Sequence, residues 1–148
     1  MKIRRGDPKD PSATALLRAS HEVMTSLFPA ESNNYLSIEE LCVPDVRFFL
    51  ADVGGDAVGC GAIADREGYG ELKSMFVAEK ARGSGVADAL VEHLEADARH
   101  AGHGLIRLET GTLLHAALNL YSRHGYKFRT RFGDYIEAPY SLYMEKSL

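Results

Sequence analysis

Cysteine is scarce in this chain of 148 residues: Cys42 and Cys60 are the only two, and their spacing matches no metal-binding motif. Two isolated thiols are typical of small buried residues in a reducing compartment, whereas a disulfide framework would need more of them. The histidines do not pair at metal-ligand spacing either. We therefore expect no metal site, and we expect the protein to reside in the cytoplasm.

A surplus of positive charge is missing as well. The 17 lysines and arginines are outnumbered by 21 aspartates and glutamates, which gives a formal net charge of −4. Proteins that bind nucleic acid in general need a basic surface, because their affinity comes largely from contacts to phosphates. The charge balance therefore argues against DNA or RNA as a partner.

Long apolar runs are the third absence. No run reaches the roughly 18 residues that a membrane-spanning helix needs, and the first seven residues lead into no apolar signal-peptide core. We therefore expect no membrane partner. Hydrophobic residues make up 45% and charged residues 26% of the chain, as in a soluble globular protein. The length suits one domain over residues 1–148.

Hydrophobic periodicity and turn residues divide the chain into strands and helices. Hairpins come first and strand–helix–strand units second, which predicts a mixed α/β fold with a mostly antiparallel sheet and helices on both faces. Strands are expected at residues 2–5, 46–52, 57–64, 72–77, 105–110, 126–129 and 141–146. Helices are expected at residues 13–28 with Ser12 as the cap, 37–40, 86–98 and 113–122.

Residues 71–90, in the middle of the chain, combine a short apolar strand, a turn with two glycines and the start of a helix. Gly83 and Gly85 allow the backbone to turn sharply and leave no Cβ in the way of a ligand. The first turn of a helix has N–H donors without partners, at the positive end of the helix dipole. This turn is therefore predicted to bind a phosphate or pyrophosphate.

Three kinds of phosphate-binding loop have glycines in such a turn. A nucleotide P-loop ends in Gly-Lys-Ser/Thr, which does not follow Gly85, and a dinucleotide-binding loop has a third glycine where this chain has Asp88. The third kind is the acyl-CoA loop Arg/Gln-x-x-Gly-x-Gly/Ala, which Arg82, Gly85 and Ala87 match. The alternative without a ligand is a glycine turn that only joins a strand to a helix.

With this loop and a second motif, the chain resembles the GCN5-related N-acetyltransferase superfamily. The second motif, ALNLYSRHGY at residues 117–126, is similar to the superfamily signature Ala-x-x-x-Tyr-x-x-x-Gly-Phe/Tyr. The resemblance covers the chain from about Phe48 to the C-terminus. The runs at residues 71–77, 108–111 and 143–146 together look like a bacterial subgroup of small stand-alone acetyltransferases. The resemblance implies that acetyl-CoA is the co-substrate and that Tyr121 is the general acid at the CoA sulfur.

The resemblance also implies where acetyl-CoA binds. The central parallel pair of strands, near Val77 and Leu108, is expected to separate, and the backbone of Met75, Phe76 and Val77 is expected to pair with the pantetheine arm as an added strand would. The amides of the glycine loop are expected to hold the pyrophosphate; they belong to Arg82, Gly83, Ser84, Gly85, Val86 and Ala87.

Acetyl transfer to an amine also requires the amine to lose a proton, and two glutamates are candidate bases. The resemblance to histone-type members indicates Glu71, at the start of the central strand, where Glu71, Lys73 and Met75 are expected to share one face. Glu109 would end the next strand, where the cofactor groove opens, and a partly apolar cleft raises the pKa of a carboxylate. Ion pairs with Lys73 or Arg107 are the alternative, and catalysis without a side-chain base is another.

One position departs from the superfamily pattern. Many members have an asparagine seven residues before the tyrosine, where it contacts the pantetheine arm, and this chain has Leu114 there. Asn119 lies close by in sequence but on a different face of the helix. It is the remaining candidate for a pantetheine contact from this helix.

The function expected is transfer of an acetyl group from acetyl-CoA to an amine of a small molecule or peptide. The amine would attack directly in a ternary complex, with no covalent enzyme intermediate. A non-catalytic domain of the same fold that binds or senses acyl-CoA is the alternative. The acceptor is not identified by any motif, and a homodimer is an alternative to the monomer.

Overall fold

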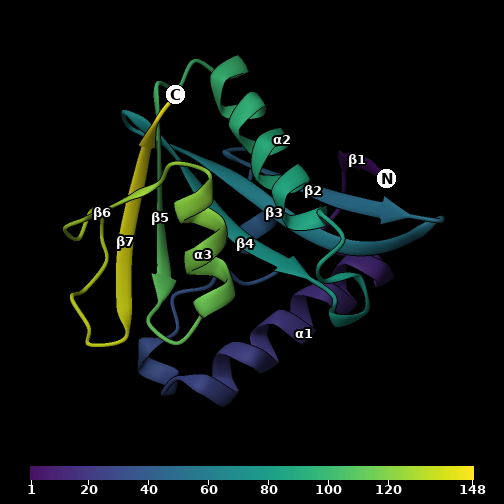
Figure 1. Ribbon diagram of the computed structural model, residues 1–148, viewed down its shortest axis with the longest axis horizontal. Coiled ribbons are helices and arrows are strands. Elements are labelled where there is room, and N and C mark those ends of the chain that lie inside the picture. Colours follow the sequence, from purple (N-terminus) through teal and green to yellow (C-terminus); the bar gives the residue numbers. More distant parts are fainter.

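The computed structural model describes residues 1–148 and contains one seven-stranded sheet (Figure 1). The strand order is β1-β2-β3-β4-β5-β7-β6, and every neighbouring pair is antiparallel except β4 and β5. This confirms the mixed, mostly antiparallel sheet. The strands are β1 (Lys2–Arg5), β2 (Val46–Val53), β3 (Asp56–Arg66), β4 (Tyr69–Val77), β5 (Leu105–Gly111), β6 (Lys127–Arg129) and β7 (Ser141–Ser147).

Helices cover both faces of the sheet, as predicted. Figure 1 shows α2 (Val86–His100) and α3 (His115–Arg123) in front of the sheet, while α1 (Pro11–Leu27) passes below the ends of β4 and β5. The apolar face of α1 packs against one side of β2 and β3, and α2 and α3 share a core with the other side of the sheet. None of the helices has the length and apolar composition of a membrane span.

The first helix begins differently from the prediction. Ser12 was expected to cap it, but the helix starts at Pro11, and Asp10 is the N-cap residue without a side-chain capping bond. Proline suits the first helical position, because its fixed φ is already helical and its missing N–H would have no partner there. The end is as expected: Phe28 follows the last turn and Pro29 comes next.

The predicted capping box at Ser37 and Glu40 is present, but the helix that it caps is of a different type. The Ser37 N–H donates to Glu40 Oε1 at 2.9 Å, and the Glu40 N–H donates to Ser37 Oγ at 3.1 Å. The capped segment is a single 3₁₀ turn, η2 (Glu40–Cys42), rather than an α-helix. Two other 3₁₀ turns occur, η1 (Ala30–Ser32) after α1 and η3 (Glu79–Ala81) after β4.

The central strand β4 begins earlier than predicted. Its hairpin with β3 is tight, with Arg66 and Tyr69 paired across a two-residue turn. As a result, Glu71 lies in the interior of the strand and not at its start. The strand also contains an irregularity that the sequence did not indicate: Ser74 has φ +57, and the register against β3 shifts beside it.

This irregularity changes which side chains share a face. Glu71 and Lys73 contact one another on the α1 side of the sheet, as expected. Met75 was expected on the same face, but it lies on the α2 side, where its sulfur borders Gly61. The prediction for Met75 was wrong because a left-handed residue in a strand breaks the alternation of side chains.

Gly111, the last residue of β5, offers a stability test of how β5 packs against the end of α1. An added Cβ would lie 2.3 Å from the Cζ atom of Phe28, a buried ring that also packs on Tyr140. We expect Gly111→Ala to lower the free energy of unfolding by about 1–3 kcal/mol through overpacking. Gly104→Ala is the matched control, because nothing lies near its Cβ position. Equal urea midpoints for the two variants would contradict this packing.

Candidate functional site

The candidate site lies where the central parallel strands β4 and β5 separate. β4 and β5 are paired only at Gly70–Ile106 and Glu71–Arg107, although β4 continues to Val77 and β5 to Gly111. The predicted separation of this pair is therefore present, and Ser74 lies just beyond the last paired residue. Phe76 and Val77 pair with β3 on one side only. Residues 75–77 thus present a free strand edge toward the split, as an added extended ligand would require.

The glycine loop lies at the end of this free edge. Gly83 and Gly85 have φ values of +78 and +87, and Gly85 is the N-cap residue of α2. The backbone N–H groups of residues 83–88 donate to no acceptor within the protein. Unpaired donors at the positive end of a helix form a site for a phosphate group. The loop therefore has the conformation that the sequence predicted.

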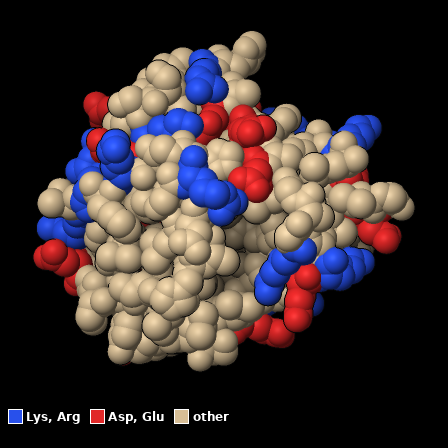
Figure 2. All heavy atoms as spheres, viewed as in Figure 1, with Lys and Arg blue, Asp and Glu red and all other residues tan.

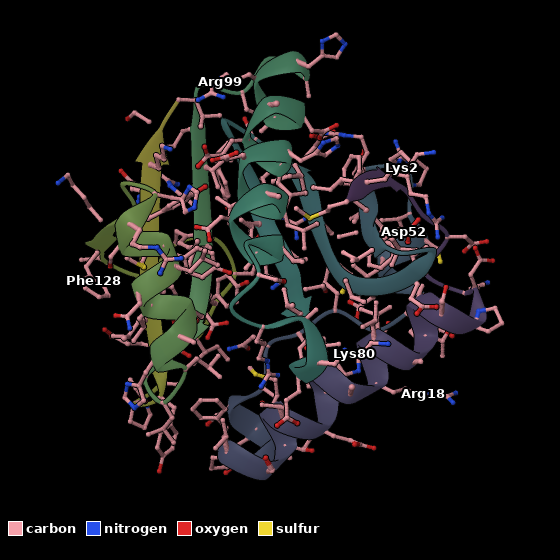
Figure 3. All side chains as sticks on the ribbon, turned by 45° about the vertical axis from the view of Figure 1, so that its right-hand side comes forward. Lys2, Arg18, Asp52, Lys80, Arg99 and Phe128 are labelled. Atoms are coloured by element: carbon pink, nitrogen blue, oxygen red, sulfur yellow. The ribbon has the colours of Figure 1, made fainter.

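Arg82 anchors the loop to the end of β4. Its Nε donates to the Val77 carbonyl at 3.1 Å, and its guanidinium carbon lies 5.8 Å from the centre of the Phe76 ring. Both side chains line a groove of about 650 Å³ between α1 and the segment after β4. Figure 3 shows Lys80 at the wall of this groove, whereas Arg18 of α1 points away into solvent. The groove therefore adjoins the residues predicted to hold the cofactor.

Tyr121 lies on the same side of the sheet as the loop. It is buried on α3, in the core that α2 and α3 share with β5, and its ring packs on Tyr126 at 5.7 Å between centroids. Its hydroxyl makes no hydrogen bond within the protein, and burial raises the pKa of Tyr121 above its ordinary value. The phenol therefore stays protonated well past neutral pH, as a proton donor to a thiolate must.

The other predicted contact of α3 lies elsewhere on the helix. Asn119 is exposed and makes no hydrogen bond, and Leu114 is the N-cap residue. The helix begins at His115, two residues later than predicted. A contact between Asn119 and the pantetheine arm stays a prediction.

An ion-pair cluster joins α2 to α3 beside the loop. Asp88, in the first turn of α2, pairs with Arg123 at 3.0 Å and with His124 at 2.7 Å. Hydrogen bonds from His124 and Arg123 lower the pKa of Asp88. Figure 2 shows side chains of both signs gathered over the area between these helices. The guanidinium of Arg123, at the end of α3, is therefore paired with the Asp88 carboxylate.

Glu71 lies on the α1 side of the sheet, and both of its carboxylate oxygens accept hydrogen bonds. Only 3% of the residue is exposed. One carboxylate oxygen accepts a hydrogen bond from Arg66 at 3.0 Å, and the other accepts one from the Tyr135 hydroxyl. The Lys73 ammonium lies 3.7 Å from that second oxygen. The predicted ion pair with Lys73 is therefore present, in a larger cluster.

Two members of this cluster, Tyr135 and the backbone carbonyl of Asn34, were not predicted from the sequence. Lys73 is buried, and its ammonium donates to the Tyr135 hydroxyl at 2.7 Å and to the Asn34 carbonyl at 3.1 Å. Tyr135 comes from the loop between β6 and β7, which has no periodic pattern that would place it. Lys73 did give a signal, since it is a charged residue two positions from Glu71 within an otherwise apolar strand.

Glu109 lies on β5 next to the split and is half-buried, directly opposite Tyr143 of β7. No arginine or lysine is within ion-pair distance of it; its expected partner Arg107 pairs with Glu145 at 3.1 Å instead. Burial raises the pKa of Glu109, although Ser141, Lys73 and Asn34 oppose that effect. Of the two candidate bases, Glu109 is the one whose carboxylate is not held by a cation.

The two candidate bases and the candidate acid therefore lie on opposite faces of the sheet. Tyr121 and the glycine loop are on the α2–α3 side, and Glu71 and Glu109 are on the α1 side. The split between β4 and β5 connects the two sides. A thioester in the split would have a proton donor on one side and a carboxylate on the other.

Comparisons with known proteins identify the family of the chain. The sequence model of the family described as "Acetyltransferase (GNAT) family" matches residues 13–126. The chain is similar to the IAA acetyltransferase of Azospirillum brasilense, with 43% identity over 148 residues that cover 99% of this chain and 97% of the relative.

Solved structures show the same fold. A Klebsiella pneumoniae protein assigned as an acyl-CoA N-acyltransferase is 35% identical, with a TM-score of 0.84 and coverage of 99% of this chain and 97% of that one. A GNAT family acetyltransferase from Elizabethkingia anophelis with acetyl-CoA bound is 18% identical, with a TM-score of 0.72 and coverage of 99% and 97%. By its family match and its relatives, this chain belongs to the acetyltransferase (GNAT) family and is an acyltransferase.

Proposed function

We propose that this protein transfers an acetyl group from acetyl-CoA to an amine of a small molecule or peptide, by direct attack within a ternary complex. The observation that carries the proposal is the free edge of residues 75–77 next to a loop whose amides are unpaired. An extended arm and a pyrophosphate, joined as they are in CoA, match these two features. The Elizabethkingia neighbour of the same fold carries acetyl-CoA.

The pantetheine arm would pair with the backbone of Met75, Phe76 and Val77, and the loop amides would hold the pyrophosphate. The arm's thioester end would then reach into the split between β4 and β5. No charged side chain is needed for this mode of binding, because backbone N–H and C=O groups make the contacts. Arg82 adds a positive charge at the loop.

The chemistry follows from the groups on either side of the split. The amine nitrogen forms a bond to the thioester carbonyl carbon, and the bond between that carbon and sulfur breaks. Glu109 takes the proton that the amine loses, and Tyr121 donates a proton to the departing sulfur. The products are an amide and free CoA, so no group of the enzyme is modified.

Glu109 is a better base than Glu71 because of what each carboxylate contacts. Both oxygens of Glu71 accept hydrogen bonds, and Arg66 and Lys73 neutralise its charge. Its two oxygens are therefore engaged within the protein and not directed at a substrate amine. Glu109 has no cation within ion-pair distance, and burial raises its pKa above the ordinary 4.5. A raised pKa makes the ionised carboxylate a stronger base toward the proton of the amine.

This assignment predicts how the rate depends on pH. Because Glu109 must be ionised, kcat/KM should fall on the acid side as pH drops through its raised pKa, above the ordinary range of a carboxyl group. Glu109→Gln should remove that acid limb and lower the rate by about 100-fold or more. Glu71→Gln should keep the limb. If Glu71→Gln removes the limb and Glu109→Gln keeps it, the base is Glu71.

Binding of acetyl-CoA is tested by isothermal titration calorimetry on the purified chain. We expect saturable binding at one site per chain. A lack of any heat of binding with millimolar acetyl-CoA would refute the proposed function, whatever the acceptor.

A further inference from the structure

Lys73 and Glu109 occupy equivalent places at the mouth of the split. The last paired residues of β4 and β5 are Glu71 and Arg107. Lys73 and Glu109 each follow two residues later, so both side chains project to the same side as those of the last pair. They therefore project from the same face of the sheet, one from each strand, where the two strands begin to separate and on the side from which the acceptor would meet the thioester.

The Lys73 ammonium is fixed in this place by two hydrogen bonds. Its acceptors are the Asn34 carbonyl at 3.1 Å and the Tyr135 hydroxyl at 2.7 Å. The Tyr135 ring packs on Tyr143 at 5.8 Å between centroids, and Tyr143 is the residue directly opposite Glu109. Lys73 and Glu109 therefore lie next to the same pair of packed rings, Tyr135 and Tyr143. Only 8% of Lys73 is exposed, so water screens its charge weakly. The same burial lowers the pKa of Lys73, and the charges of Glu71 and Glu109 oppose that effect.

Among the charged groups around Glu109, Lys73 is the one that favours the ionised carboxylate. The charged groups that act on Glu109 are Lys73 and Glu71, both from β4. The charge of Glu71 is countered by Arg66 at 3.0 Å and by Lys73 at 3.7 Å. Arg107, on the same strand as Glu109, is countered by Glu145. The uncharged polar neighbours are Asn34, Tyr135, Ser141 and Tyr143.

We infer that Lys73 is a positioning residue for Glu109: its fixed ammonium keeps the half-buried Glu109 carboxylate ionised, so that this carboxylate can take the proton of the acceptor amine. The inference rests on the proposed function, in which Glu109 is the base. Lys73 itself contacts no substrate in this role. Tyr135 takes part indirectly, because its hydroxyl holds the ammonium in place.

The test is the position of the acid limb of kcat/KM in Lys73→Gln, a variant that keeps hydrogen-bond donors for Asn34 and Tyr135 but removes the charge. The limb should move to higher pH by about one unit, the lower end of the effect of a neighbouring opposite charge. The rate on the plateau above the limb should stay close to that of the wild type. Tyr135→Phe keeps the ring packing and should move the limb in the same direction by less.

Lys146→Gln is the matched control. Lys146 also pairs with a buried glutamate, Glu95, at 3.0 Å, but its pair lies on the α2 side of the sheet. Loss of a buried ion pair is therefore common to both variants, and only Lys73→Gln removes a charge near Glu109. The limb should not move in Lys146→Gln.

A measurement on the intact Lys73 covers the case in which Lys73→Gln does not fold. In protein labelled with ¹³C-lysine, the Cε signal of Lys73 should shift with a midpoint at the pH of the acid limb, as Glu109 titrates. That inflection should disappear in Glu109→Gln and persist in Glu71→Gln.

The outcomes distinguish a failure of the role of Lys73 from a failure of Glu109 as the base. If Glu109→Gln removes the limb but neither Lys73→Gln nor Tyr135→Phe moves it, and no inflection is seen at Lys73, the role of Lys73 is refuted and the base assignment stands. If the limb persists in Glu109→Gln, Glu109 is not the base and the role of Lys73 is refuted with it.

Discussion

Replacing Tyr121 by phenylalanine is expected to slow the chemical step by about 10²–10⁴-fold, the usual contribution of a positioned general acid. The ring is buried in the core between α2 and α3 and packs on Tyr126, so phenylalanine can keep its place. The variant loses only the hydroxyl, which makes no hydrogen bond within the protein. The affinity for acetyl-CoA should therefore stay within a few-fold of the wild type.

The pH profile adds a second check on Tyr121. Since burial raises its pKa above the ordinary 10, the phenol stays protonated at neutral and moderately alkaline pH. No loss of rate from ionisation of Tyr121 is therefore expected below pH 10. Tyr126→Phe is the control, because it removes a buried hydroxyl from the neighbouring ring. Wild-type turnover by Tyr121→Phe, with chemistry rate-limiting, would show that Tyr121 is structural.

The second large effect is expected at Gly85, where aspartate should abolish detectable binding of acetyl-CoA. The new carboxylate would stand among the amides that are proposed to hold the pyrophosphate. At about 4 Å and an effective dielectric constant near 20, the repulsion of one unit charge is about 4 kcal/mol, or roughly a thousandfold in Kd. Strain adds to this, because Gly85 has φ +87 and side chains rarely adopt that conformation.

Two controls separate charge from strain in that experiment. Gly85→Ala adds the strain without the charge and should weaken binding far less. Gly102→Asp adds both the strain and the charge at the other end of α2, where glycine has φ +94 and an added Cβ meets nothing. The affinity of this variant for acetyl-CoA should equal that of the wild type. If calorimetry finds the same Kd for Gly85→Asp and the wild type, the loop does not hold the pyrophosphate.

Local patterns were sufficient to predict most of the fold. The hairpin between β2 and β3 turns at Gly54 and Gly55, both of which have positive φ as such a turn requires. The strand, glycine loop and helix around Gly85 were predicted from the same kind of signal. These features depend on residues close together in sequence, which is why sequence alone indicates them.

The parts of the site that sequence reasoning missed depend on contacts between distant segments. A serine gives no local reason for φ +57, so the irregularity at Ser74, and with it the placement of Met75, comes from how β3 and β4 pack. Tyr135 donates to Glu71 across 64 positions of sequence. That contact, together with Arg66 and Lys73, distinguishes Glu71 from Glu109, and no spacing motif connects Tyr135 to Glu71.

The most direct test of acetyl transfer is a thiol-release assay with acetyl-CoA and a panel of acceptors, combined with mass spectrometry of the products. The panel should contain polyamines, amino acids, arylamines, aminoglycosides, peptides and the acceptor of the Azospirillum relative. We expect turnover with at least one amine, one acetylated product for each CoA released, and no acetylated enzyme along the way. Tight binding of acetyl-CoA without turnover on any acceptor would contradict the account and favour a protein that only senses acyl-CoA.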